Sequence, residues 1–198
     1  MKFYHRTATK PERVGVVAGS FNPPTIAHRE LARAAAMHVD EVIYVIPREF
    51  PHKGYFGATL EERIEMLKLA GAGSRYSIAA SERGLFLDIA RECKEHFGSG
   101  VQLYFACGSD AAERIFTWDY GRPGVAEEML DAFELLVAPR GESFRAPESW
   151  RDRVRVLEIG GAVADVSSTE VRERIARAEP WEHLVPEAIV ERVREIYS

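Results

Sequence analysis

The sequence has few of the features that set membrane, secreted or metal-binding proteins apart. Two of its 198 residues are cysteines, Cys93 and Cys107, and they have neither the spacing of metal ligands nor the pairs of a disulfide framework. This usage is typical of a reducing cytosol. No apolar run approaches membrane-spanning length, and residues 1–13 lack the apolar core of a signal peptide. We therefore expect a cytoplasmic protein with no membrane partner.

Basic residues are scarce relative to acidic ones. Lys and Arg number 26 against 31 Asp and Glu, which gives a formal net charge of −5. Without a chain-wide basic field we expect no nucleic-acid partner, and any phosphate site must be local. The sequence also lacks internal repeats and low-complexity linkers. We expect a single domain over residues 1–198, with a C-terminal helical segment from about 168 to 198.

Short β-branched runs alternate with helical patterns along the chain. Strands are expected at 14–18, 41–46, 76–80, 101–106, 134–138 and 154–159. Helices are expected at 31–37, 60–70, 86–97, 111–118, 127–132, 168–178 and 186–197. The alternation predicts an α/β fold, namely a Rossmann-like open parallel sheet with helices on both faces. In such a sheet, ligands bind beyond the carboxyl ends of the strands.

A loop rich in Gly and Pro joins the first expected strand to the first expected helix. It reads Gly19-Ser20-Phe21-Asn22-Pro23-Pro24-Thr25-Ile26-Ala27-His28. The backbone N–H groups of such a loop and the N-terminus of the next helix converge on one point with partial positive charge, which suits a phosphate. We expect an anion beside His28. The plainer alternative is a turn before a helix with a capping or core histidine.

A second helix start, near the C-terminus, offers similar donors. In the run Val166-Ser167-Ser168-Thr169-Glu170-Val171-Arg172, Ser167 is the expected N-cap and Glu170 the third helical residue. A capping box would by itself explain this Ser and Glu. Hydroxyls, free backbone donors and a guanidinium within one turn also suit a polyphosphate.

Together the two segments resemble the nucleotidyltransferase superfamily, whose signatures are G-x-F-x-P-x-[H/T]-x-x-H and S-S-T-x-x-R. The matching residues are Gly19, Phe21, Pro23, Thr25 and His28 in the first, and Ser167, Ser168, Thr169 and Arg172 in the second. The Gly-Ser-Phe-Asn-Pro opening is most similar to the nicotinamide and nicotinate mononucleotide adenylyltransferases.

The resemblance implies a reaction. The 5′-phosphate of a mononucleotide would attack the α-phosphate of ATP, giving NAD or its deamido form and releasing pyrophosphate. His28, Lys53 and Arg172 are the implied catalytic residues: His28 would stabilise the charge at the α-phosphate, while Lys53 and Arg172 would hold the β- and γ-phosphates. Mg²⁺ would enter with ATP and bridge phosphate oxygens with few protein ligands, so we expect no metal site built by the protein. Assembly into a homo-oligomer stays open.

The resemblance also implies two sets of binding residues. ATP is expected to contact Gly19, Ser20, Phe21, Thr25, His28, Gly108, Asp110, Ser167, Ser168, Thr169 and Arg172. The mononucleotide is expected to contact Asn22, Phe86, Trp118 and Arg140. Asp110 would hold the ATP ribose and Trp118 would stack on the pyridine ring. Ordinary structural roles remain as alternatives: a helix cap for Asp110, a core position for Trp118, a solvated loop for Lys53 and a salt bridge for Arg140.

One departure from the family pattern concerns the acceptor. Bacterial nicotinate-mononucleotide enzymes carry a Ser-Tyr-Thr-like segment that helps bind the nicotinate carboxylate, whereas this chain has Gly84-Leu85-Phe86-Leu87-Asp88. An apolar segment cannot supply those hydrogen bonds, so we expect weak discrimination against nicotinamide mononucleotide. The alternatives are a related transferase that uses CTP or another acceptor such as phosphopantetheine, and a non-catalytic nucleotide sensor, which would not need His28. A dehydrogenase is disfavoured because no G-x-G-x-x-G follows the first strand.

Overall fold

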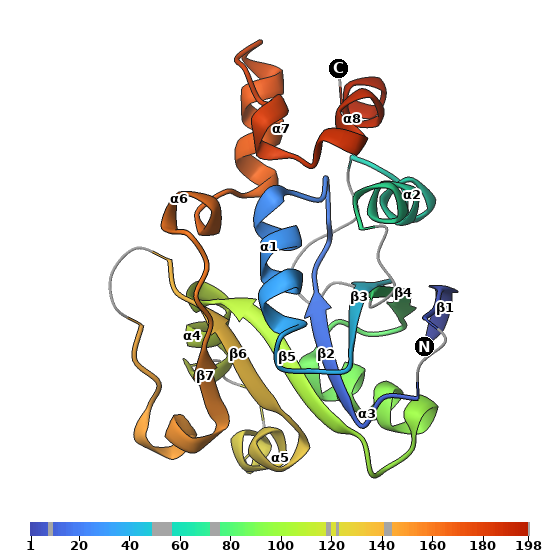
Figure 1. The fold of residues 1–198 in the computed structure, drawn as a ribbon. Helices are drawn as coiled ribbons and strands as arrows, with labels where there is room; N and C mark the ends of the chain where they lie inside the picture. The colour runs from blue at the N-terminus through green and yellow to red at the C-terminus, as the bar shows by residue number, and fades with distance from the viewer. Residues whose placement is uncertain are drawn as a thin grey trace.

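A single twisted sheet forms the centre of the computed structural model, which describes residues 1–7, 10–48, 57–71, 76–117, 120–121, 123–140 and 144–197 (Figure 1). Its strand order is β1-β4-β3-β2-β5-β6-β7. The strands are β1 Lys2–His5, β2 Arg13–Ala18, β3 Glu41–Pro47, β4 Tyr76–Ser81, β5 Gln102–Gly108, β6 Glu134–Ala138 and β7 Val154–Val156. Strands β2 to β7 pair in parallel, which confirms the expected parallel sheet.

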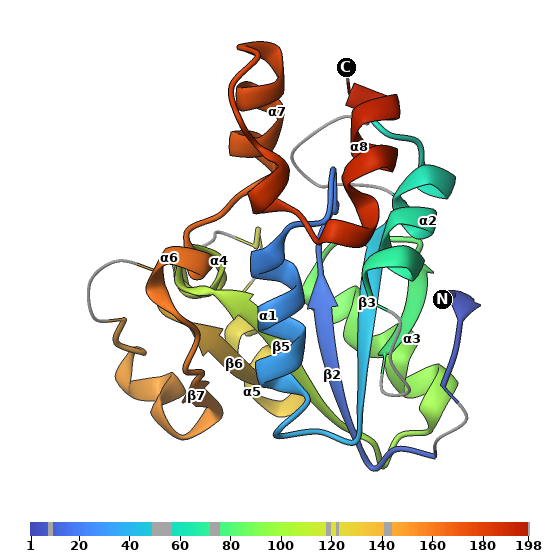
Figure 2. The same cartoon turned by 45° about the horizontal axis from the view of Figure 1, so that its top comes forward.

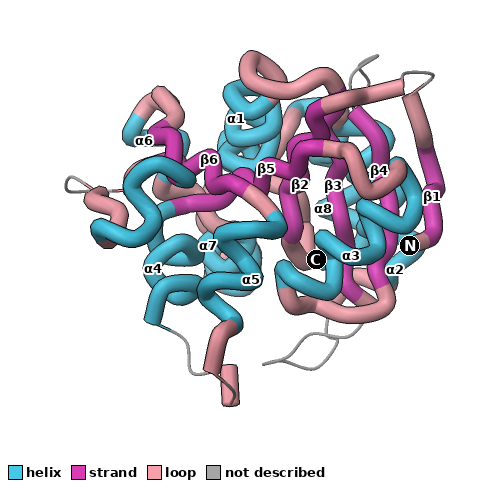
Figure 3. Tube along the Cα trace, turned by 90° about the horizontal axis from the view of Figure 1, so that it is seen from below, coloured by secondary structure: helices cyan, strands magenta, loops and turns pink. Residues whose placement is uncertain are grey.

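Helices cover both faces of the sheet, as the alternating pattern predicts. They are α1 Ile26–Ala35, α2 Leu60–Ala70, α3 Phe86–Phe97, α4 Ser109–Thr117, α5 Val125–Ala132, α6 Gly161–Ala164, α7 Ser168–Ala176 and α8 Val190–Tyr197. Figure 3 shows α1 and α6 on one side of the strands, with α3, α4 and α5 on the other.

The two faces are built by alternation within fully buried strands. In β3, Val42 and Tyr44 join the core cluster that includes α1 and α2, while Ile43 and Val45 join the cluster that includes α3, α4 and α5. Every residue of β3 is buried. A strand covered on both faces reads as a continuous apolar run, which is why β3 could be predicted so simply.

The structure corrects several of the expected elements. Strand β1, which runs antiparallel to β4, is not among the expected strands. It is four residues long with a partly exposed pattern, so it lacks the signal of a buried strand. Strand β7 ends at Val156 rather than at 159, and α6 follows where no helix is expected. Helix α1 begins at Ile26, five residues earlier than the expected 31, because the Thr25 side chain caps it.

The chain ends in a helical layer above the carboxyl ends of the strands. Helices α7 and α8 stand there beside the start of α1 and along α2 (Figure 2). Val171 and Ile189 of this layer are buried together with Ala27 of α1 and Met66 of α2. Within the described residues, none of the helices combines the length and apolar character needed to cross a membrane.

Candidate nucleotide site

The loop between β2 and α1 lies at the carboxyl edge of the sheet. Gly19 donates its N–H to the Val45 carbonyl of β3 at 3.0 Å. Phe21 is fully buried and has a left-handed backbone with φ 46°. Its ring meets His28 edge-on, with centroids 5.0 Å apart, and Tyr44 at 5.5 Å. A Cβ at Gly19 would lie 3.3 Å from that ring, so the inward turn of Phe21 leaves little room for a larger residue there.

Thr25 and His28 form a capping box at the first turn of α1. The Thr25 hydroxyl oxygen accepts a hydrogen bond from the His28 N–H at 3.4 Å, and the Thr25 N–H donates to His28 Nδ1 at 3.0 Å. The Thr25 hydroxyl also lies 2.8 Å from Nδ1. Because a backbone N–H can only donate, Nδ1 must be the acceptor and the ring proton belongs on Nε2. His28 is therefore fixed as a hydrogen-bond donor through Nε2.

The environment of His28 keeps it neutral. Burial of much of the ring, together with the positive charge of Arg140, lowers the pKa of His28 to about 4. An uncharged imidazole at neutral pH can polarise an anion by donating a hydrogen bond from Nε2–H, but it does not act as a general acid. The alternative of a capping histidine is confirmed, because His28 takes part in the capping box of α1 through Nδ1. Capping does not use Nε2, which can donate to a ligand.

Arg140, whose charge acts on this histidine, forms an ion pair with Asp110. Helix α4 begins at Ser109 directly after β5, with no intervening turn, so Asp110 lies in its first turn. Its carboxylate pairs with the Arg140 guanidinium at 3.2 Å, and the Arg140 N–H donates to Ser109 Oγ at 3.1 Å. A Cβ at Gly108 would lie 3.0 Å from Arg140 Nε, so glycine makes room for the arginine side chain. The salt bridge expected as an alternative for Arg140 is present.

The C-terminal signature lies against the same loop. Ser167 caps α7 and accepts from the Glu170 N–H at 3.1 Å, as expected, but the Glu170 carboxylate bonds Arg174 at 2.8 Å instead of completing a capping box. Ser168 Oγ donates to the Pro23 carbonyl at 2.7 Å. Arg172 donates to the Asn22 carbonyl at 2.5 Å. Residues about 150 positions apart in the chain thus share one site.

The Arg172 guanidinium donates hydrogen bonds to neighbouring carbonyl and hydroxyl oxygens. Besides the Asn22 carbonyl, it donates to the Ser168 carbonyl at 3.0 Å and to the Thr169 hydroxyl at 3.2 Å. Burial lowers its pKa, although a guanidinium keeps its charge in proteins. A fixed positive fork at a helix N-terminus is suited to phosphate oxygens.

The remaining expected residues differ in their placement. Asn22 is 1% exposed, and its side chain lies inside the protein. Phe86, the first residue of α3, stacks on Phe105 with centroids 4.6 Å apart and so contributes to the core. Lys53 and Trp118 lie outside the described residues, and their roles stay predictions.

Two residues that contact the loop were not expected from the sequence. Arg63 of α2 is 1% exposed; it donates to the Ala58 carbonyl at 2.7 Å and to the Ser20 carbonyl at 3.4 Å. Tyr197 of α8 donates to the Asn22 side-chain oxygen. Arg63 does leave a trace in the sequence, because it occupies the apolar stripe of Leu60, Ile64 and Leu67. A charged residue within such a stripe indicates buried backbone partners.

The carboxyl edge of this parallel α/β sheet carries the starts of α1, α4 and α7, the neutral donor His28 and the Arg172 guanidinium. This arrangement is typical of nucleotide-binding proteins of the nucleotidyltransferase fold class. Comparison with known proteins makes this specific. Residues 16–174 match the family described as cytidylyltransferase-like. The chain belongs to this family.

Two sequence relatives extend the match over nearly the whole chain. The probable nicotinate-nucleotide adenylyltransferase of Moorella thermoacetica is 32% identical over 204 residues, covering 94% of this chain and 91% of its own. The protein of the same name from Gloeobacter violaceus is 30% identical, covering 90% of this chain and 92% of its own.

A solved structure shares the fold. The nicotinic acid mononucleotide adenylyltransferase of Plasmodium falciparum, complexed with NaAD, superposes with a TM-score of 0.67 over 91% of this chain and 95% of its own. At 20% sequence identity this likeness concerns the fold alone.

Proposed function

We propose that the protein transfers the adenylyl group of ATP to the 5′-phosphate of nicotinate or nicotinamide mononucleotide. The products are deamido-NAD or NAD and pyrophosphate, so the protein acts in NAD biosynthesis. The observation that carries the proposal is the convergence of His28, Ser168 and Arg172 on the loop at 19–25. The names of the two sequence relatives support the choice of acceptor.

The chemistry asks for positioning and charge stabilisation. A phosphate monoester is already a nucleophile, so the attack on the α-phosphate needs neither a strong base nor a covalent intermediate. His28 donates from Nε2 to the α-phosphate oxygen that gains charge in the transition state. Arg172, Ser168 and Lys53 hold the β- and γ-phosphates, which leave as pyrophosphate.

Binding of the two nucleotides is divided along the carboxyl edge. We assign the ATP phosphates to Gly19, Ser20 and the start of α7, and the ATP ribose to Asp110. Asp110 already accepts a hydrogen bond from Arg140 at 3.2 Å, so a ribose diol would compete with or join that pair. Trp118, Phe86 and Arg140 are assigned to the mononucleotide.

Mg²⁺ enters as the Mg·ATP complex in this proposal. Among the residues that the structure describes, no three His, Cys, Asp or Glu side chains are grouped as ligands for a metal ion. Mg²⁺ that is bound through substrate phosphates and water needs few protein ligands, and it would neutralise charge on the leaving pyrophosphate.

We further propose that residues 1–198 work as one nucleotidyltransferase domain, with the C-terminal helical segment from about 168 to 198 included. The packing of Val171 and Ile189 against Ala27 and Met66 supports this. The net charge of −5 supports small-molecule partners over nucleic acid.

A panel of acceptors tests the proposal and its specificity. The protein is incubated with Mg·ATP or Mg·CTP and with nicotinate mononucleotide, nicotinamide mononucleotide or phosphopantetheine, and pyrophosphate release is measured. We expect release with ATP and both pyridine mononucleotides. Specificity constants should differ by far less than the roughly 10⁴–10⁵ that a hydrogen-bonding site achieves, because Leu85 and Phe86 offer no polar side chain to leave unpaired. A strong preference for nicotinate mononucleotide would contradict the predicted weak discrimination. Pyrophosphate release only with phosphopantetheine, or only with CTP, would contradict the proposed adenylyl transfer to a pyridine mononucleotide.

A further inference from the structure

The side chain of Asn22 is a meeting point of three segments. Its Oδ1 accepts a hydrogen bond from the Ala58 N–H, just before α2, at 3.2 Å. The same oxygen accepts the hydroxyl of Tyr197, near the end of α8. A Cβ on Gly57 would lie 2.8 Å from Oδ1, so the chain there packs tightly on the amide. Asn22 is therefore buried by contacts from the segment that leads into α2 and from α8.

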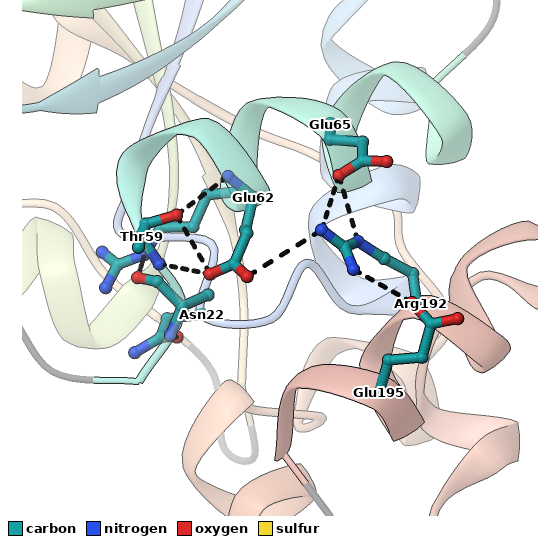
Figure 4. A network of polar contacts seen from close by, with 8 residues as sticks. Asn22, Thr59, Glu62, Glu65, Arg192 and Glu195 are labelled. Carbon is teal, nitrogen blue, oxygen red and sulfur yellow. Dashed lines mark hydrogen bonds and ion pairs between the residues drawn. The ribbon is translucent and has the colours of Figure 1, made fainter.

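Helix α8, which carries Tyr197, is held against α2 by ion pairs. Figure 4 shows Arg192 of α8 between three carboxylates, Glu62 and Glu65 of α2 and Glu195 of α8 itself. Its guanidinium lies 2.9 Å from Glu65, 2.9 Å from Glu195 and 3.8 Å from Glu62. Glu62 in turn accepts the Thr59 N–H at 2.8 Å at the start of α2. Arg192 therefore ties α8, which carries Tyr197, to α2, and Ala58 just before α2 also contacts Asn22.

The Tyr197 hydroxyl is kept in its donor form. Burial raises the pKa of Tyr197 to about 12, although the charges of Arg63 and Arg172 act in the opposite direction. The phenol thus stays protonated over the whole physiological range. Arg63 and Arg172 also donate to loop carbonyls, at Ser20 and Asn22 respectively. Unlike the contacts of Arg63 and Arg172, the contact of Tyr197 can be removed without changing a charge.

We infer that Tyr197 is a positioning residue of the nucleotide site: its hydroxyl orients the Asn22 side chain and thereby sets the course of the loop that leads to His28. This inference rests on the proposed function for the site. On this inference, α8 contributes to the nucleotide site, because its residue Tyr197 orients a side chain of the loop although it lies far from Asn22 in the sequence. A tyrosine that only packs α8 onto α2 would contribute to stability but not to nucleotide binding or turnover.

A double-mutant cycle separates these roles. Tyr197→Phe removes only the hydroxyl, Asn22→Ala removes its acceptor, and Asn22→Asp keeps an acceptor oxygen. Tyr4→Phe is the matched control, since the Tyr4 hydroxyl accepts a hydrogen bond from Arg48 at 3.0 Å on the edge strand β1. Each variant is measured by thermal unfolding, by calorimetric binding of a non-hydrolysable ATP analogue, and by kcat and KM for ATP.

We expect Tyr197→Phe to weaken analogue binding or kcat/KM by about 3- to 10-fold, the effect of one hydrogen bond. The loss should persist in Asn22→Asp and disappear in Asn22→Ala, because coupled partners do not add. Tyr4→Phe removes a hydrogen bond on the edge strand β1, so it should leave analogue binding, kcat and KM unchanged even where it lowers the unfolding temperature. An equal loss in the Asn22→Ala background, or a lowered unfolding temperature of Tyr197→Phe with unchanged binding and turnover, would overturn the inference. Binding of the ATP analogue does not require the mononucleotide. The coupling between Tyr197 and Asn22 can therefore be measured even if the proposed transfer reaction fails.

Discussion

At the scale of single residues, the chemistry depends on the state of one imidazole. The Thr25 N–H occupies Nδ1 of His28, and burial keeps the ring neutral, so the only donor it can offer is Nε2–H. A fixed donor of this kind stabilises charge that develops in the transition state without paying for reorganisation. In the proposed reaction, His28 would therefore affect the rate more than ground-state binding.

Replacing His28 with alanine tests that role. We expect His28→Ala to lower kcat by about 10²–10³, the usual effect of losing one preorganised donor to developing charge. The affinity for ATP should change much less, since Arg172 and the loop N–H groups remain. Steady-state kinetics and equilibrium binding of ATP measure the two effects separately. A variant with near-normal turnover would show that His28 only caps α1.

The depressed pKa of His28 also makes stability depend on pH. The folded pKa of about 4 lies below the ordinary 6.5, so the unfolded chain binds the proton more tightly. The free energy of unfolding should thus fall as pH drops through the window from 6.5 toward 4. Urea unfolding at about pH 7 and about pH 5 should show a loss up to about 2 kcal/mol larger in wild type than in His28→Gln. Equal losses in the two proteins would contradict a neutral His28 in the folded protein.

Residues of the site differ in how well the sequence predicts them. Thr25 and His28 follow a motif with a fixed spacing, and their capping geometry is a local property of the chain. Arg63 and Tyr197 have no motif, because their partners are backbone groups and an amide brought near by tertiary packing. Only the position of Arg63 in an apolar stripe hints at its burial.

At the scale of elements, the site is built from helix starts. Helices α1, α4 and α7 all begin at the carboxyl edge, with Thr25 and Ser167 as caps of the first and last. Caps are short-range signals, so the starts of α2 and α7 were predictable to the residue. Strand β1 and helix α6 were not, because an exposed four-residue edge strand and a four-residue helix are stabilised by tertiary contacts rather than by their own patterns.

Substitutions of Ser167 test whether the start of α7 binds phosphate or only caps the helix. Aspartate caps helices about as well as serine, so Ser167→Asp should change the free energy of unfolding by less than about 0.5 kcal/mol. The added negative charge should repel the ATP polyphosphate and raise the KM for ATP by about 10-fold or more. Ser167→Asn, which caps without charge, is the matched control. An unchanged KM in Ser167→Asp would mean that the start of α7 serves only to begin a helix.

At the scale of the whole molecule, the parallel sheet brings distant segments to one edge. The loop at 19–25, the start of α4 and Arg140 follow β2, β5 and β6 respectively, and the carboxyl ends of these parallel strands lie at the same edge of the sheet. The placement of α7 and α8 over this edge could not be predicted from the alternation of strands and helices. It depends on long-range contacts such as Ser168 to Pro23 and Arg192 to Glu65.

Adenylyl transfer carries the α-phosphorus of ATP into the dinucleotide, so the fate of that atom distinguishes it from hydrolysis of ATP. The protein is incubated with Mg²⁺, nicotinate mononucleotide and ATP labelled at the α-phosphorus, and the products are separated and identified by mass. We expect the label in the dinucleotide and unlabelled pyrophosphate, and we expect neither product without the mononucleotide. Label found only in AMP or ADP, or product formation that does not require the mononucleotide, would contradict it.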